Sequence, residues 1–284
     1  MDDPEMVKFE LKRIHFTSDL GMTKTLQIIK GIMNFKTLIL IMLYTCIQGC
    51  SKSTVDPICY LNKPRDTYKY PILPRSPEWA LLNTSEEMDS VLQIPNQILK
   101  SISTEGLVET SLHYPRFSDL YFSDDYQRAF NIIESHFNGF QELLKRSDAA
   151  SVLTERYELM DPSCIHNNYP SINGDGSSTS FSFAFIEILI AQYEILSLLE
   201  NENLQTLLKE CLLKYEVKKD NNSSLFTLKH SLLIAARIMY FDNYDQFIQE
   251  YNNNESIKFF TDRVMLLDST TLDVIYDLAK RFPN

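Results

Sequence analysis

The chain has 284 residues, of which 44% are hydrophobic, enough to bury the core of one large domain or two smaller ones. Its 38 acidic and 27 basic residues give a formal net charge of −11. We exclude nucleic acid as a partner, because phosphate contacts need clustered lysines and arginines and here these residues are scattered. Only 7 glycines are present, which counts against folds built on tight hairpins and phosphate-binding loops.

The N-terminal region carries the pattern of an export signal. Residues 37–47 (TLILIMLYTCI) form an uncharged apolar run that follows Lys30 and Lys36. The run is too short to cross a bilayer, which takes roughly 20 residues, and it lacks the polar face of a buried core helix. A basic N-terminal region, a short apolar stretch and a small residue before the cleavage site are typical of a secretory signal peptide.

The residues after this run, Ile47-Gln48-Gly49-Cys50, resemble the lipobox of bacterial lipoproteins. In that family the cysteine receives a diacylglyceryl group, cleavage occurs before it, and the new amino terminus is acylated. The resemblance therefore implies lipidation of Cys50. Each methylene of the acyl chains that is buried in the bilayer adds about 0.8 kcal/mol of membrane affinity, which would hold the protein at a membrane. Cys46 is an alternative site, although the residues before it fit the pattern less well.

The residues before the signal need an explanation, because a signal peptide normally starts close to its basic residues. Met22 or Met33 would each begin a signal of ordinary length. We expect translation to start at one of them, and the alternative is a short amphipathic cytoplasmic tail. Residues 1–49 are thus predicted to be an upstream extension plus the signal peptide.

Residues 50–78 are predicted to form a lipidated, extended tether. Proline fixes φ and removes a backbone donor, and this segment contains Pro57, Pro64, Pro71, Pro74 and Pro77. In the lipoproteins that the signal resembles, an acidic run soon after the lipidated cysteine directs export to the cell surface. The residues after Cys50, SKSTVD, lack such a run. We therefore expect a cell-envelope protein anchored in the outer membrane and facing the periplasm.

A succession of short, capped helices is expected from residue 79 onward. Thr84 with Glu87 forms a capping box, and Pro95 suits the first turn of the next helix. The caps predicted for the following helices are Ser103, Ser123 or Asp124, Asn138 (with Gln141) and Asp148.

A longer helix is expected beyond the loop near residues 161–179. Residues 181–199 are apolar almost all round, which predicts a central, buried helix. Further helices are expected near residues 203–217, 225–241, 244–252, 255–266 and 270–282. No segment alternates with the period of two that strands show. Residues 79–284 are therefore predicted to be an all-α domain, a multi-helix array of short antiparallel helices that is either α-solenoid-like or an irregular bundle.

Residues 79–161 are similar to a family of uncharacterised all-helical lipoproteins from Bacteroides-type bacteria. The pieces that carry the similarity are LNTSEEM, LQIP, STEGLVE, FNGFQEL and the segment Arg146–Ala149. The resemblance implies an all-helical envelope protein. It transfers no functional residue, because no activity is known for the family.

The sequence holds no motif that assigns a catalytic, metal or cofactor-binding residue. A Gly-rich phosphate loop, a nucleophile elbow and an HExxH pattern are all missing from it. Asp161, Cys164 and His166 offer at most three ligands, short of the four that zinc takes. Residues 173–177 (NGDGS) are rich in oxygen ligands but lack the glycine and the glutamate that a calcium loop places after them. A flexible turn is the favoured interpretation.

Cysteine content fits export without requiring disulfides. With Cys46 removed and Cys50 lipidated, Cys59, Cys164 and Cys211 would remain, an odd number that leaves at least one free thiol. Cys211 lies within a helical pattern and is expected to be a buried, small apolar residue.

Aromatic and histidine side chains are interpreted as structural. Tyr240, Phe241, Tyr244 and Phe247 recur at helical spacing, which favours core packing over an aromatic sugar-binding platform. The single histidines on expected helices are interpreted as interfacial or surface residues: His113, His136 and His230.

Asp268-Ser269-Thr270 resembles the short O-glycosylation site of exported proteins in Bacteroides-type bacteria, which would place a glycan on Ser269. The alternative is that Asp268 or Ser269 caps the last helix, and this interpretation is favoured because cap residues are far commoner than modified ones.

Three functional hypotheses follow. The leading one is a non-enzymatic interaction or scaffold module that binds another envelope protein. The second is a ligand-binding lipoprotein of nutrient uptake, which would need a concave aromatic pocket, and the third is a hydrolase. A pocket with convergent polar groups would favour the second or third, whereas an exposed groove or apolar patch would favour the first.

Overall fold

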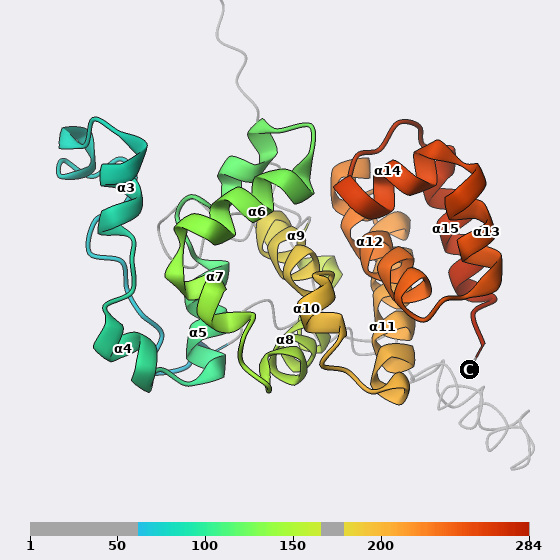
Figure 1. The fold of residues 1–284 in the computed structure, drawn as a ribbon, viewed down its shortest axis with the longest axis horizontal. Helices are drawn as coiled ribbons and strands as arrows, with labels where there is room; N and C mark the ends of the chain where they lie inside the picture. The colour runs from blue at the N-terminus through green and yellow to red at the C-terminus, as the bar shows by residue number, and fades with distance from the viewer. Residues whose placement is uncertain (1–61, 166–178, 284) are drawn as a thin grey trace, which may run out of the picture. The chain divides into compact units, whose positions relative to one another are not determined.

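The computed structural model describes residues 62–165 and 179–283, all of which belong to the unit that begins at Pro57. This part of the chain contains helices and no β-strand, so the predicted all-α fold is confirmed (Figure 1). No helix in it is long and apolar enough to span a membrane.

The first half of the described chain consists of short helices. Its α-helices are α3 (Ser85–Val91), α4 (Asn96–Ser101), α5 (Thr104–Leu112), α6 (Tyr126–His136), α7 (Asn138–Leu143) and α8 (Ala149–Glu158), with 3-10 helices η1 (Trp79–Leu81), η2 (Phe117–Phe122) and η3 (Pro162–Ile165). The second half contains α9 (Thr179–Ile190), α10 (Tyr193–Leu196), α11 (Asn201–Asp220), α12 (Leu225–Phe241), α13 (Asp245–Asn253), α14 (Glu255–Arg263) and α15 (Thr270–Lys280).

Local caps start several of these helices as predicted. Both halves of the capping box between Thr84 and Glu87 are formed at α3. Ser103 Oγ accepts a hydrogen bond from the Gly106 N–H, 3.0 Å away, at the start of α5. The cap of α6 lies one residue later than predicted, because it is Asp125 whose carboxylate accepts from a backbone N–H of the first turn.

Other predicted caps have a longer-range role. Asn138 is the first residue of α7 and its amide caps nothing; instead it accepts from the Ile94 N–H at 3.0 Å and donates to the Ile94 carbonyl at 2.8 Å. Asp148 precedes α8 but accepts from the Thr104 hydroxyl at 2.9 Å. The predicted capping by Asn138 and Asp148 is therefore wrong, and Pro95 stands just before α4 rather than in its first turn.

The helix predicted over residues 181–199 is broken in two. Gln192 adopts an extended backbone (ψ 137°) between α9 and α10. Arg237 Nη1 of α12 donates to the carbonyl of Ala191 at 2.9 Å, and the Gln192 amide donates to the Ile188 carbonyl at 2.7 Å. These bonds stabilise the break, because they satisfy carbonyls that the interrupted helix leaves without an N–H partner.

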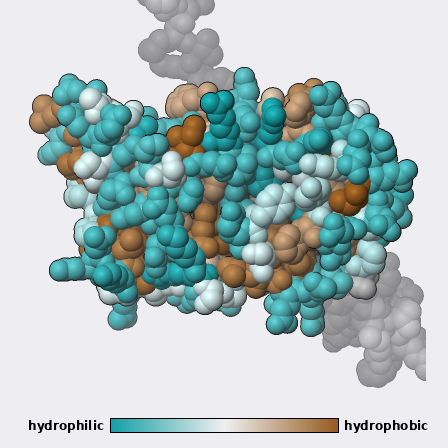
Figure 2. Space-filling model, viewed as in Figure 1, coloured by the Kyte–Doolittle hydropathy of each residue, from teal (hydrophilic) through white to brown (hydrophobic). Residues whose placement is uncertain are grey.

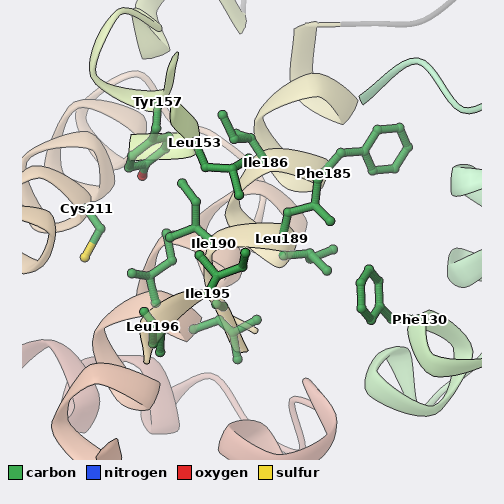
Figure 3. Packing of buried hydrophobic residues seen from close by; sticks show 14 of the residues in the cluster. Phe130, Leu153, Tyr157, Phe185, Ile186, Leu189, Ile190, Ile195, Leu196 and Cys211 are labelled. Carbon is green, nitrogen blue, oxygen red and sulfur yellow. The ribbon is translucent and has the colours of Figure 1, made fainter. Parts of the chain in front are cut away.

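The buried core is centred on α9 and α12. Residues 183–191 are all buried, which confirms the predicted central position of this helix. Helix α12 pairs with α11 and also packs against α9 and α15. Figure 3 shows side chains from α6, α8, α9, α10 and α11 converging in this core, among them Phe130, Leu153, Ile186 and Leu196.

Part of the predicted tether packs on the helical domain. The segment has no regular secondary structure around Tyr68 and Tyr70, where the Tyr68 N–H donates to the Thr110 hydroxyl at 2.9 Å and the Tyr70 hydroxyl donates to the Thr110 carbonyl at 3.0 Å. A Cβ added to Gly106 would lie 2.5 Å from the Asp66 carboxylate, so α5 needs a glycine at this contact. Residues 66–70 therefore form part of the packing of the domain.

Candidate functional site

A groove of about 520 Å³ lies among residues of α3, η2 and α6. Its lining mixes apolar side chains with charged ones, whereas small-molecule pockets are lined mostly by hydrophobic and aromatic side chains. The lining residues are Asp89, Tyr114, Arg116, Asp119, Phe122, Ser123, Asp124, Asp125, Arg128, Ala129, Ile132, Ile133 and His136.

Arg116 forms ion pairs with two aspartates of the groove. Arg116 Nη1 lies 2.5 Å from the Asp89 carboxylate of α3, and its Nε lies 2.8 Å from the carboxylate of Asp119 in η2. Burial opposes the charge of Arg116, but the hydrogen bond that Arg116 donates to Asp119 and the charges of both carboxylates raise its pKa overall. Arg116 therefore fixes α3 against η2.

Two large apolar side chains of the groove face solvent. The side chain of Phe122, at the end of η2, is 90% exposed, and that of Ile132 in α6 is 52% exposed. Figure 2 shows that hydrophobic side chains on the face in view form small patches separated by hydrophilic ones. Exposed apolar side chains beside charged ones mark interaction sites, so the groove fits a small interface with a protein segment.

A buried polar cluster is the strongest alternative as a site of chemistry. Glu187 Oε1 of α9 accepts hydrogen bonds from the Tyr157 hydroxyl at 2.8 Å, from Lys218 Nζ at 2.6 Å and from Ser231 Oγ at 2.6 Å. Lys218 Nζ also lies 2.9 Å from Ser231 Oγ. A serine beside a lysine is a nucleophile and base pair found in some hydrolases.

The position of this cluster favours a structural role. The side chains of Glu187, Lys218 and Ser231 are fully buried between α8, α9, α11 and α12, where a substrate does not reach them. Burial lowers the pKa of Lys218, while the Glu187 carboxylate opposes this shift. The Ser231 hydroxyl already donates its hydrogen bond to Glu187 Oε1, and the second Glu187 oxygen has no hydrogen-bond partner in the described part of the chain. We interpret the cluster as the polar centre of the core.

The predicted lipidation site, Cys50, lies outside the described residues, as do His166 and the segment 173–177. Cys164 is disulfide-bonded, which removes its thiolate as a metal ligand. Among residues 62–165 and 179–283, no group of three or more His, Cys, Asp or Glu side chains could hold a metal ion. Cys211 is a free thiol and fully buried, as expected, and burial raises its pKa.

The three histidines occupy different environments. His136 is exposed at the end of α6, and His113 is partly buried next to Glu109. His230 is fully buried in α12, stacked against the Tyr126 ring of α6 with centroids 6.2 Å apart, and burial lowers its pKa well below the usual range. His230 is thus an interfacial residue between helices.

Ser269, the predicted glycosylation site, is exposed and makes no capping hydrogen bond to α15. Asp268 is the cap, because its carboxylate accepts from the Thr271 N–H at 2.9 Å and from the Thr270 hydroxyl at 2.7 Å. The bond from Thr270, followed by those from Ser256 and Thr271, lowers the pKa of Asp268. Of the two residues predicted as alternative caps, only Asp268 has this role.

Because Asp268 caps α15 and Ser269 does not, variants of the two residues test capping and glycosylation separately. Asp268→Ala is expected to lower the urea midpoint of unfolding, because an N–H of the first turn of α15 loses its partner. Ser269→Ala is expected to leave the midpoint unchanged, and it would remove a large mass from the intact protein if Ser269 carries a glycan. Urea titration and intact-protein mass spectrometry measure the two effects. A wild-type mass of peptide plus lipid alone would exclude the glycan.

Comparison with protein-family models, with curated proteins and with solved structures finds no match to this chain.

Proposed function

We propose that this protein is a lipid-anchored, non-enzymatic interaction module of a bacterial cell envelope, and that it binds another envelope protein through the groove between α3, η2 and α6. The observation that carries the proposal is the 90% exposure of Phe122 beside the charged side chains of the groove. Aromatic side chains are enriched in protein interfaces relative to the rest of the surface, so an exposed phenylalanine suits the anchor of a small interface.

The anchor is proposed from the sequence that surrounds Cys50, and the expected location is the outer membrane, facing the periplasm. The disulfide of Cys164 agrees with this location, because disulfides persist in oxidising compartments such as the periplasm.

The charges of the groove indicate the chemistry of the partner. Asp89 and Asp119 are occupied by Arg116, and Asp125 caps α6. Asp124 is exposed and adds to an excess of acidic side chains in the lining. We therefore propose a partner segment with an apolar side chain that covers Phe122 and a flanking lysine or arginine. Such a contact is small, which fits a transient complex.

A site-specific crosslink tests this proposal. A photoreactive amino acid in place of Phe122 is expected to give one discrete protein adduct in intact cells, since the partner covers this position. Ile132→Asp, which puts a charge into the same groove, is expected to remove most of the adduct by costing at least tenfold in affinity, or about 1.4 kcal/mol.

The matched control places the same amino acid at Leu159, which is 65% exposed and lies outside the groove. The proposal requires that the adduct be absent at this position. The same set of adducts from both positions, or an adduct that Ile132→Asp leaves unchanged, would contradict a specific site in the groove.

A further inference from the structure

A second pocket, of about 440 Å³, lies where α10, the end of α12 and α13 meet. Three tyrosines follow one another along it: Tyr193 of α10, Tyr240 of α12 and Tyr251 of α13. The ring centroids of Tyr193 and Tyr240 are 6.2 Å apart, and those of Tyr240 and Tyr251 are 4.6 Å apart. The three rings form a continuous aromatic wall that is only partly buried.

The fold holds these rings in place from behind. The break before α10 puts Tyr193 at the start of that helix, with its ring 5.3 Å from the guanidinium carbon of the buried Arg237. The Tyr251 hydroxyl donates to the carboxylate of Asp262 in α14, 3.0 Å away. Because these side chains are already fixed, little of their conformational entropy is lost when a ligand binds.

The polar groups of the pocket are neutral amides. Asn243 and Asn252 line it and are exposed, and each carboxamide can both donate and accept hydrogen bonds. Phe241, next to the tyrosine wall in the lining, is 39% exposed and adds a further aromatic face. The pocket thus combines aromatic rings with carboxamides, of which that of Asn243 already donates one hydrogen bond, to the Phe241 carbonyl at 3.4 Å.

The charges around the pocket disfavour an ionic ligand. No side chain that lines the pocket is charged, so an anion would find no counter-charge within the lining itself. A cationic ligand would meet Arg237 at the Tyr193 ring and Lys258, whose Nζ lies 5.7 Å from the centroid of Tyr251. These cations already occupy the tyrosine rings that a cation-binding aromatic cage would use. The remaining class is a neutral ligand that has both apolar and hydroxyl-bearing surfaces.

We propose that this pocket binds a neutral saccharide. The C–H face of a sugar ring packs on an aromatic wall, and its hydroxyls, which both donate and accept, pair with carboxamides such as those of Asn243 and Asn252. The volume of about 440 Å³ lies within the range of small-molecule sites. The saccharide site shares no lining residue with the groove that contains Phe122, so it is independent of the proposed protein interaction.

The probe is a printed array of neutral and sialylated oligosaccharides, applied to the full-length lipidated protein in detergent. We expect binding to neutral members that 0.5 M NaCl leaves unchanged, because no ion pair contributes. Asn252→Ala and Phe241→Ala are each expected to weaken binding about tenfold, which is the loss of one good contact. Asn252 is exposed, so its variant should keep the urea midpoint of the wild type, whereas Phe241 is 39% exposed and its variant is expected to lower the midpoint modestly.

Phe122→Ala is the matched control, since it also removes an exposed phenylalanine but lies in the other groove. It is expected to keep full saccharide binding, whereas Asn252→Ala is expected to keep the crosslink at position 122. The saccharide proposal is overturned if no neutral oligosaccharide binds, if only sialylated ones bind, or if both pocket variants bind as the wild type does. None of these outcomes would change the crosslink, so the two proposals fail separately.

Discussion

Replacement of Lys218 by alanine is expected to lower the free energy of unfolding by about 3–5 kcal/mol, because it leaves the buried Glu187 carboxylate without its counter-charge. Lys218 Nζ lies 2.6 Å from Glu187 and 2.9 Å from Ser231, and all three side chains are fully buried. The ammonium group also lies 4.8 Å from the centroid of Phe183. Urea unfolding followed by far-UV circular dichroism measures the loss.

Two further variants test whether the unpaired charge of Glu187 causes the loss of stability. The double variant Glu187→Met, Lys218→Met removes both charges and is expected to recover most of the stability, since an apolar pair of similar volume can replace a buried ion pair. Arg263→Ala breaks the exposed contact with Asp125, where the atoms are 3.9 Å apart, and is expected to cost well under about 1 kcal/mol. A loss below about 1 kcal/mol for Lys218→Ala would show that the pair is not the stabilising centre of the core.

Cys50→Ser is expected to abolish fatty-acid labelling and to move the protein out of the membrane fraction or leave its signal uncleaved. The physical reason is that buried acyl chains would supply the membrane affinity of the protein. Labelling cells with a palmitate analogue, followed by fractionation, measures the effect. Cys46→Ser is the control and should behave as the wild type. Unchanged labelling of the Cys50→Ser protein would exclude lipidation at this residue.

The sequence predicted those parts of the fold whose causes are local. Thr84 and Glu87 cap α3 through atoms within one turn, and α12 has the bounds that were expected from its apolar pattern. The break between α9 and α10 could not be predicted, because it depends on Arg237, which is far along the chain. Asn138 was misassigned for the same reason, since its partner is Ile94.

The candidate sites were harder to predict than the helices. Glu187 carried a usable signal, because an acid between the apolar residues Ile186 and Ile188 requires a buried partner, but the sequence did not identify Lys218 as that partner. Phe247 is core, as expected from its spacing, whereas Tyr240 and Phe241 line a pocket. The difference arises at the end of α12, where the chain turns into α13 and leaves one side of these rings uncovered.

The burial of Cys211 determines how fast its thiol can be oxidised. The side chain is fully buried in α11, and the raised pKa keeps it protonated, which is the unreactive form. An oxidant can attack it only in molecules whose core has opened, so the rate of damage follows the equilibrium population of open molecules. Any change that loosens the contact between α11 and α12 therefore exposes the protein to oxidation in proportion to the opening that it causes.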